Sequence, residues 1–387
     1  MTQSPLLNSG ALPSGVRPRY VDNGNGLEMH ILEAGFESGK PPCVVLLHGF
    51  PELGYSWRKI MAPIAAAGYY VVAPDQRGYG ATKGWTATYD GELKPFRMTN
   101  LVNDVVGLLS ALDYKEAVVM GHDFGSPVAA YCALMRPDVF RAVSLMSAPF
   151  TSAPKLGSQM GDSSEESQEE TPDIHKALAA LDTPRKHYQW YYSTREADRD
   201  MWKCPQGLQN FLRAYYHCKS ADWSHNKPFP LKSWTASELA KLPTYYIMQL
   251  NQNMAETVAT EVPTLTGIEK CRWLTEEELE VYSHAFEITG FQGGLQWYRC
   301  STTGAFDDEL QVFGGKTITV PSCFIAGKSD WGVYQKPGAF EQMQTHTLSD
   351  FRGCHLINGA GHWVQQEQPA AVSEVLIDFL HATKSPS

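Results

Sequence analysis

The segment "VVMGHDFGSPVAA", residues 118–130, limits the possible folds of this chain more than any other. An apolar run ends at Met120, a Gly-His-Asp-Phe-Gly turn follows, and Ala129 and Ala130 belong to the start of a helical pattern. This layout is a nucleophile elbow, a strand-turn-helix corner so tight that only small residues fit beside the reactive one. Asp123 occupies the reactive position, so we expect its carboxylate to be exposed at the end of a strand.

The rest of the chain predicts an α/β fold with a mostly parallel central sheet and helices on both faces. Short β-branched runs alternate with helical patterns, which is typical of such sheets. The segments "RYVDNGNG" and "LEMHILEAG" contain an Asn-Gly turn signal and predict an antiparallel edge hairpin. The expected strands of the main sheet are "PCVVLLH", "YYVVAPD", "EAVVMGH", "AVSLMS", "SCFIAG" and "CHLINGAG". The segment "NLVNDVVGLLSALD" spaces its leucines and valines as one apolar helix face.

A helical insertion interrupts this alternation. Strand patterns stop after residue 150 and resume near 300, and the pieces between them are aromatic and favour helices. We therefore expect a loose N-terminal arm over 1–20, a core formed by 21–150 and 300–387, and a helical cap over 151–299. The acidic, serine-rich stretch 157–173 is expected to form a loop, because it has little apolar surface to bury. The cap would cover the carboxyl ends of the strands, where open α/β sheets bind ligands.

Composition excludes several classes of partner. A formal net charge of −10 argues against nucleic-acid binding. No apolar run is long enough for a membrane span, and the N-terminus lacks the pattern of a secretory signal.

The eight cysteines form no CxxC pair, which suggests a reducing compartment, and we expect the cytoplasm. His217, Cys218 and His225 lack the spacing of a zinc site, so no metal and no cofactor are expected. The oligomeric state stays open, with a homodimer possible.

Three chemical groups fall at predicted strand ends in the order nucleophile, acid, histidine. Asp123 is followed by Asp330, after "CFIAGKS", and by His362, in "NGAGHW". The loop histidine can turn its ring over the sheet, and Asp330 can fix the tautomer and orientation of that ring. Asp350 is the weaker alternative for the acid, and His355 is more consistent with a residue inside a strand.

The motif "HGFPE", residues 48–52, supplies a fourth element of the expected site. It follows the strand "VVLL", and its turn would expose the backbone N–H of Phe50. Phe124, directly after the nucleophile, would expose a second N–H. Two donors directed at one point form an oxyanion hole.

A carboxylate nucleophile limits the reaction. A serine that attacks saturated carbon forms a stable ether, whereas an aspartate forms an ester that water can cleave. Asp123 therefore favours substrates that alkylate, namely epoxides or alkyl halides. His362 would then activate the water that attacks the carbonyl carbon of the ester. Phe124 stands where a tryptophan commonly holds a halide and has no side-chain donor, while the cap is rich in tyrosines that can donate a proton to an epoxide oxygen.

The chain resembles the epoxide hydrolases of the α/β-hydrolase superfamily over nearly its full length. The motifs that carry the resemblance are "HGFPELGYSWR", "APDQRGYG", "GHDFGSPVA", "GFQGGLQWYR", "AGKSDWGVYQ" and "GAGHWVQQEQP". The resemblance implies two cap tyrosines that hydrogen-bond the epoxide oxygen. It assigns these roles to Tyr188, in "HYQWYY", with Tyr191 as the alternative, and to Tyr282. Two departures from the common pattern are Phe124, where many relatives have tryptophan, and the acidic insertion.

The expected activity is conversion of a small apolar epoxide and water to a vicinal diol without a cofactor. The residues expected to line the substrate pocket are Phe50, Pro51, Phe124, Gln189, Trp331 and Trp363. A haloalkane or haloacid dehalogenase with the same nucleophile is the nearest alternative. A ligand-binding protein without activity is the alternative from another class, although such a protein would not need the full set of Asp123, Asp330 and His362.

Overall fold

A computed structural model of the chain describes residues 12–155 and 173–384. Residues 1–11 of the expected N-terminal arm and 157–172 of the expected acidic loop lie outside the described residues. The expected arm, 1–20, extends beyond the start of the sheet, because strand β1 begins at Val16. Residues 16–20 pair with β2 and so belong to the sheet.

The core is an eight-stranded sheet in the order β1-β2-β4-β3-β5-β6-β9-β10. The predicted edge hairpin is present, since β1 and β2 are antiparallel, and β2 also runs antiparallel to β4. All other neighbouring pairs are parallel, which confirms the expected mostly parallel sheet. The strands are β1 (Val16–Asp22), β2 (Glu28–Ala34), β3 (Cys43–Leu47), β4 (Tyr70–Pro74), β5 (Ala117–His122), β6 (Phe140–Met146), β9 (Ser322–Gly327) and β10 (Phe351–Ile357).

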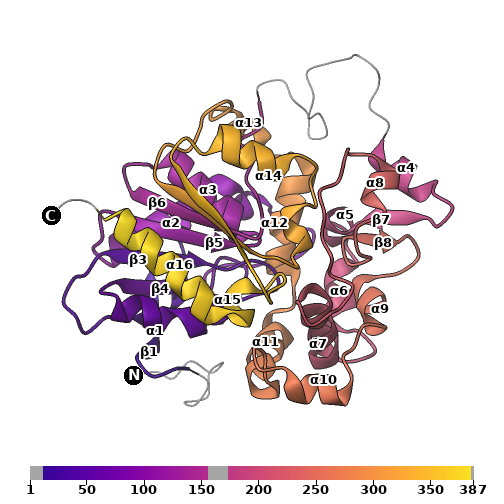
Figure 1. The fold of residues 1–387 in the computed structure, drawn as a ribbon, viewed down its shortest axis with the longest axis horizontal. Coiled ribbons are helices and arrows are strands. Elements are labelled where there is room, and N and C mark those ends of the chain that lie inside the picture. Colours follow the sequence, from indigo (N-terminus) through magenta and orange to yellow (C-terminus); the bar gives the residue numbers. More distant parts are fainter. Residues whose placement is uncertain (1–11, 156–172, 385–387) are drawn as a thin grey trace.

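Helices cover this sheet and connect its strands. Helices α1 and α16 pack against each other, as do α2 and α3, and α16 crosses in front of the strands in Figure 1. The core helices are α1 (Arg58–Ala66), α2 (Met98–Ala111), α3 (Gly125–Met135), α13 (Asp307–Gln311), α14 (Ala339–Gln342), α15 (Val364–Glu367) and α16 (Pro369–Ala382). Three short 3₁₀ helices are η1 (Gly54–Trp57), η2 (Lys94–Phe96) and η3 (Trp331–Val333), and η4 (Met343–Thr347) is a short π-helix.

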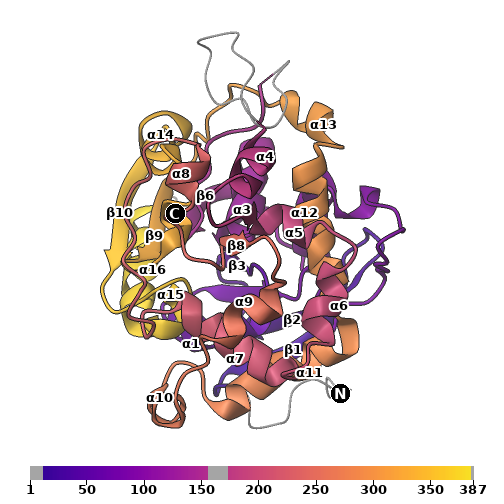
Figure 2. The same ribbon diagram turned by 90° about the vertical axis from the view of Figure 1, so that its right-hand side faces the viewer.

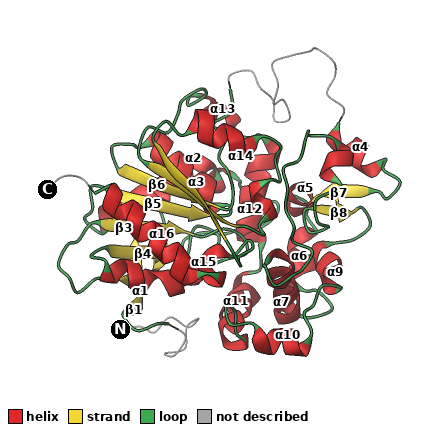
Figure 3. Ribbon diagram, viewed as in Figure 1, coloured by secondary structure: helices red, strands yellow, loops and turns green. Residues whose placement is uncertain are grey.

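A helical insertion lies between β6 and β9, as the sequence predicts, and stands beside the ends of the central strands (Figures 1 and 2). Its helices are α4 (Ile174–Ala179), α5 (Tyr188–Tyr192), α6 (Ala197–Trp202), α7 (Leu208–Lys219), α8 (Ala236–Leu239), α9 (Met254–Ala259), α10 (Leu265–Lys270), α11 (Glu276–Thr289) and α12 (Gln292–Thr303). The expectation of a strand-free insertion was wrong. Strands β7 (Arg185–His187) and β8 (Ile247–Gln249) pair antiparallel (Figure 3), and each is too short to give a periodic signal.

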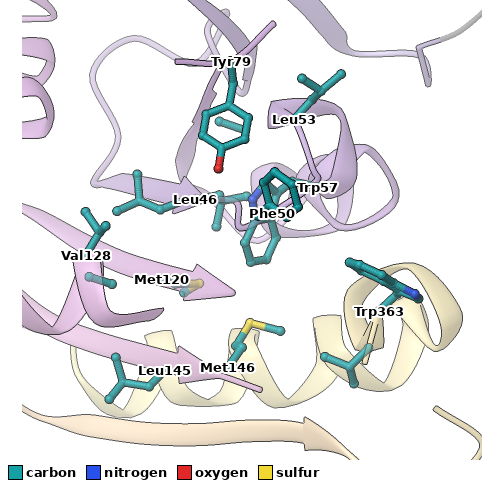
Figure 4. Close-up of a cluster of buried hydrophobic side chains, with 14 of the residues drawn as sticks. Leu46, Phe50, Leu53, Trp57, Tyr79, Met120, Val128, Leu145, Met146 and Trp363 are labelled. Carbon is teal, nitrogen blue, oxygen red and sulfur yellow. The ribbon is translucent and has the colours of Figure 1, made fainter. Parts of the chain in front are cut away.

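The apolar core extends to the ends of the central strands. Leu46 of β3, Met120 of β5 and Met146 of β6 are fully buried, and their side chains lie near Phe50 and Trp363 (Figure 4). Burial of each large apolar side chain contributes about 1.5–3 kcal/mol, so the loops at these strand ends rest on a rigid base. Within the described residues, no helix is long and apolar enough to cross a membrane.

Candidate active site

Asp123 lies in the strained turn that the elbow motif predicts. Strand β5 ends at His122 and α3 begins at Gly125, and Asp123 between them has a φ of 52°, in the left-handed region that few non-glycine residues adopt. A Cβ atom on Gly125 would lie 2.2 Å from the carbonyl oxygen of Leu47, so this position accepts only glycine. The strain and the close packing hold the carboxylate beyond the end of the strand.

The loop after β3 lies directly against this carboxylate. A Cβ atom on Gly49 would lie 2.3 Å from the Cβ atom of Asp123, so the absence of a side chain allows the two loops to approach. The backbone N–H of Phe50 donates a hydrogen bond of 2.9 Å to Oδ1 of Asp123. One of the two expected oxyanion donors therefore touches the carboxylate in the resting protein.

His362 connects the two acidic residues. Its Nε2 atom is 3.2 Å from Oδ2 of Asp123, and its Nδ1 atom is 3.1 Å from Oδ1 of Asp330. Nε2 makes no hydrogen bond of good geometry among the described residues. The side chain of Asp123 keeps 13% of its surface exposed, against 2% for His362 and 1% for Asp330. The three residues thus lie together, with the expected nucleophile as the most accessible member.

Ser147 is a further member of this network that the sequence analysis missed. Its hydroxyl donates to Oδ2 of Asp330 and lies 2.8 Å from Nδ1 of His362. The backbone N–H of Gly332 donates to the other oxygen of Asp330 at 2.7 Å. Ser147 directly follows β6 in "SLMSAPF", a segment without a carboxylate, and its place at a strand end is the signal that the sequence offers.

Burial and charge act in opposite directions on the two carboxylates. Burial alone would raise the pKa of Asp123, but the adjacent imidazole of His362, helped by Lys219 and His122, holds the pKa well below its usual range. Burial likewise opposes ionisation of Asp330, whose pKa is lowered by His362 and Ser147. Both groups are therefore carboxylates at neutral pH, and Asp123 is ready to attack without a base.

Under the site lies a buried ion pair between Glu52 and His122. Nδ1 of His122 is 2.6 Å from Oε2 of Glu52, and Nε2 is 2.7 Å from the carbonyl oxygen of His362. Both ring nitrogens face acceptors, which requires a doubly protonated ring. Burial would lower the pKa of His122, but Glu52 outweighs it and raises that pKa to about 9. Through the contact of His122 with the carbonyl oxygen of His362, the ion pair holds the backbone of His362 in place.

Comparison with known proteins agrees with this geometry. The family model described as "alpha/beta hydrolase fold" matches residues 42–369. Epoxide hydrolase B from Mycobacterium tuberculosis is 32% identical over 361 residues, covering 92% of this chain and 96% of the relative. The chain belongs to the epoxide hydrolases of the α/β-hydrolase fold.

Relatives and solved structures of epoxide hydrolases agree over almost the whole chain. Epoxide hydrolase 3 from Siraitia grosvenorii is 27% identical and covers 93% of this chain and 96% of its own length. The solved epoxide hydrolase from an endophytic Streptomyces has a TM-score of 0.74 at 30% identity, with 96% of each chain covered. Epoxide hydrolase A from Mycobacterium thermoresistibile has a TM-score of 0.70 at 31% identity, covering 95% of this chain and 98% of that one.

Tyr188, the first cap tyrosine predicted for this epoxide hydrolase, lies at the boundary between cap and core. Its hydroxyl donates to Oε1 of Gln335 at 3.1 Å and accepts from Nε2 of Gln189 at 3.2 Å. Burial raises its pKa, and Asp123 raises it further. Tyr191, the alternative, donates instead to Asp200 at 2.9 Å, within the cap.

The contacts of Tyr282 do not suit the second tyrosine role. Its hydroxyl lies 2.8 Å from Oγ of Ser56 and donates to Oε1 of Gln366 at 3.1 Å. Burial raises its pKa, and the main charges acting on it are those of Arg58 and Glu52 rather than that of Asp123. The hydroxyl of the tyrosine that the family resemblance indicates is therefore held by the core.

Tyr298, in "GGLQWYR" on α12, is the residue that the sequence analysis missed. Its ring centroid lies 5.0 Å from that of Phe124, 5.5 Å from that of Phe50 and 6.1 Å from that of Tyr188. Burial raises its pKa, and Asp123 is the next largest cause. No hydrogen bond to the Tyr298 hydroxyl is found within the described part of the chain. The motif "GGLQWYR" is among those that carry the family resemblance, and its tyrosine is the signal that the sequence offers for this residue.

The residues predicted to line the pocket fall into two groups. Phe50 and Phe124 meet at the ring of Tyr298, and Gln189 touches the Tyr188 hydroxyl, so these three contact the two tyrosines. The other three have different neighbours: the carbonyl oxygen of Pro51 accepts from Tyr216, the Trp331 ring packs on Phe229, and the centroid of the Trp363 ring lies 4.6 Å from that of His362.

Proposed function

We propose that this epoxide hydrolase forms its diol through a covalent ester on Asp123. The proposal rests on the two contacts that the carboxylate of Asp123 makes. Oδ1 accepts the Phe50 N–H, while Oδ2 lies 3.2 Å from the buried Nε2 of His362. In the first step a carboxylate oxygen attacks an epoxide carbon, a new C–O bond forms, and the C–O bond of the ring breaks.

Tyr188 and Tyr298 are the groups that we assign to the epoxide oxygen. The ring opening places negative charge on that oxygen, and a phenol can stabilise it by a hydrogen bond and then transfer its proton. The two tyrosine rings are neighbours and both respond to the charge of Asp123. We assign a structural role to Tyr282 instead, because its hydroxyl contacts Ser56 and Gln366.

In the second step water cleaves the ester. His362 takes a proton from the water at Nε2, the hydroxide attacks Cγ of Asp123, and the N–H of Phe50, with that of Phe124, stabilises the negative oxygen. The tetrahedral intermediate expels the diol oxygen, which receives the proton from His362. Asp330 and Ser147 hold the Nδ1 side of the ring throughout. Asp123 is released as a carboxylic acid with one oxygen derived from water. It returns to a carboxylate when its proton, the second proton of that water, passes through solvent to the phenolate left by the first step.

Mass spectrometry of a His362→Gln variant tests the two-step route. Incubation with an epoxide should give an adduct equal in mass to the substrate, located on the peptide containing Asp123. An Asp123→Ala, His362→Gln double variant is the matched control and should give no adduct.

Oxygen-18 labelling of the wild-type protein gives a second readout. In a single turnover in labelled water, the label should enter Asp123 and not the diol. Label in the diol at the first turnover would contradict the ester route. Halide release from haloalkanes without diol formation from epoxides would support the dehalogenase alternative instead.

A further inference from the structure

Lys219, the last residue of α7, is a buried cation beside the site that the proposed mechanism does not use. Only 3% of its surface is exposed. Its Nζ atom donates to the hydroxyl of Tyr215 at 3.3 Å. The same atom lies over four aromatic rings, with distances to the ring centroids of 5.0–5.8 Å, those of Tyr215, Tyr245, Tyr246 and Trp363.

This lysine has no carboxylate within ion-pair distance among the residues described by the structure. A buried charge without a partner is costly, and the aromatic faces offset only part of that cost. Exposed lysines of the same chain, such as Lys83, form ion pairs with glutamate instead. A buried, unpaired ammonium that persists in a folded protein therefore points to a longer-range electrostatic role.

The backbone places Lys219 against the catalytic loop. Its carbonyl oxygen accepts the N–H of His362 at 2.9 Å, and the Trp363 ring under its ammonium belongs to the next residue. A Cβ atom on Gly361 would lie 2.6 Å from the same carbonyl oxygen. Besides the phenols and Trp363 named above, the groups that act on its charge are Asp123, Asp330, Cys218 and Glu52.

In the ester intermediate, the charges of the site do not balance without Lys219. Asp123 is then a neutral ester, so Asp330 is the one carboxylate beside the imidazole, and the Glu52–His122 ion pair adds no net charge. One uncompensated negative charge would favour the protonated form of the imidazole. A protonated ring cannot take a proton from water, so this imbalance would impede hydrolysis of the ester.

We propose that Lys219 is a positioning residue that supplies the compensating positive charge and thereby keeps His362 available as a base. The inference rests on the proposed function, since it concerns the second step of that mechanism. Burial among aromatic rings lowers the pKa of Lys219, while Asp123 and Asp330 oppose this effect, as expected for an ammonium sustained by the two carboxylates.

A Lys219→Met variant tests the proposal, because it removes the charge and keeps most of the volume. Rapid-mixing measurements would record ester formation and ester hydrolysis separately from pH 5.5 to 9.5. We expect hydrolysis of the ester to be about tenfold slower at pH 7. Its acid limb, the pH range below which the hydrolysis rate falls, should move up by about one pH unit. Ester formation should change less, so the alkyl-enzyme should accumulate at neutral pH and disappear at higher pH.

Two further variants separate charge from packing. Lys219→Arg keeps a cation that can stack on aromatic rings and should restore the wild-type acid limb even if the rates fall. Lys203→Met removes an exposed lysine that also lies over a ring, that of Trp202, and should leave the pH profile unmoved. Thermal unfolding would verify each fold, with Lys219→Gln replacing Lys219→Met if the latter does not fold.

The outcomes are distinct. An acid limb that stays in place in Lys219→Met and Lys219→Gln, whatever the rates, overturns the role of the charge. An acid limb that moves equally in Lys219→Arg also overturns it, because packing would then be the cause. Absence of any ester intermediate in the wild-type and His362→Gln proteins would instead overturn the proposed function itself.

Discussion

Tyr298 and Tyr282 lie on neighbouring helices, yet their surroundings differ. Tyr298 contacts Phe50 and Phe124, whereas the hydroxyl of Tyr282 is held by Ser56 and Gln366. A Tyr298→Phe variant should slow ester formation by about 100-fold, the usual contribution of a proton donor. Tyr282→Phe should alter that rate only a few-fold and lower the free energy of unfolding by about 1 kcal/mol. Stopped-flow kinetics and urea unfolding would measure the two effects, and the reverse order of the rate effects would refute the assignment.

The individual residues differ in how far the sequence could predict them. Asp123, Asp330 and His362 were placed at three strand ends, and parallel strands bring such ends to one edge, so their proximity follows from topology. The choice among cap tyrosines depends instead on which side of a helix faces the core. That depends on the packing of α11 and α12, which a local sequence motif does not determine. Ser147 was missed for a simpler reason, because a serine at a strand end has many possible roles.

At the scale of elements, Glu367 on α15 joins the cap to the loop that carries His362. One carboxyl oxygen accepts the N–H groups of Ala221 and Gly361, at 2.8 and 2.9 Å, and the other accepts that of Trp363 at 3.0 Å. Glu367→Ala should lower the free energy of unfolding by about 3 kcal/mol, because buried donors are left unpaired. It should also speed amide exchange at Gly361 and Trp363. Glu367→Gln keeps one acceptor and should be intermediate, and unchanged exchange in both variants would argue against this link.

The elements themselves were predictable to different degrees. Strands β3, β4 and β5 of the main sheet are fully buried runs, so their patterns are strong. Strands β7 and β8 comprise three residues each and lie among aromatic cap residues, where no alternation can be recognised. Strand β1 alternates between buried and exposed positions but follows a proline-rich segment, and its first residues were therefore assigned to the arm. Pairing with β2, not local sequence, determines where it begins.

For the whole molecule, the Glu52–His122 pair predicts how stability depends on pH. The pair connects the loop after β3 with the end of β5 and with the carbonyl oxygen of His362. The pKa of His122 rises from 6.5 to about 9 on folding, so its contribution is complete below pH 6.5 and is lost as the pH rises through 9. The pKa of Glu52 is lowered, so its contribution is lost in acid, below the range where an unfolded glutamate ionises. Between these limits the pair should contribute up to about 3 kcal/mol.

Urea unfolding at a series of pH values measures this contribution. The free energy of unfolding of the wild-type protein should decrease by about 2–3 kcal/mol from pH 6.5 to 9.5. A His122→Gln variant has no titrating ring and should be less stable at pH 6.5 but should lose less stability than the wild type over that range, the rest of the loss coming from the buried Glu367, whose pKa is raised to about 8. His284→Gln, which removes an exposed histidine of α11, should follow the wild-type curve. A His122→Gln curve parallel to the wild-type one would mean that other groups cause the alkaline loss, and that the ring is neutral in the folded protein. Because the ring also holds the His362 backbone, the same variant should lose ester hydrolysis more than ester formation, which links stability and activity through one buried ion pair.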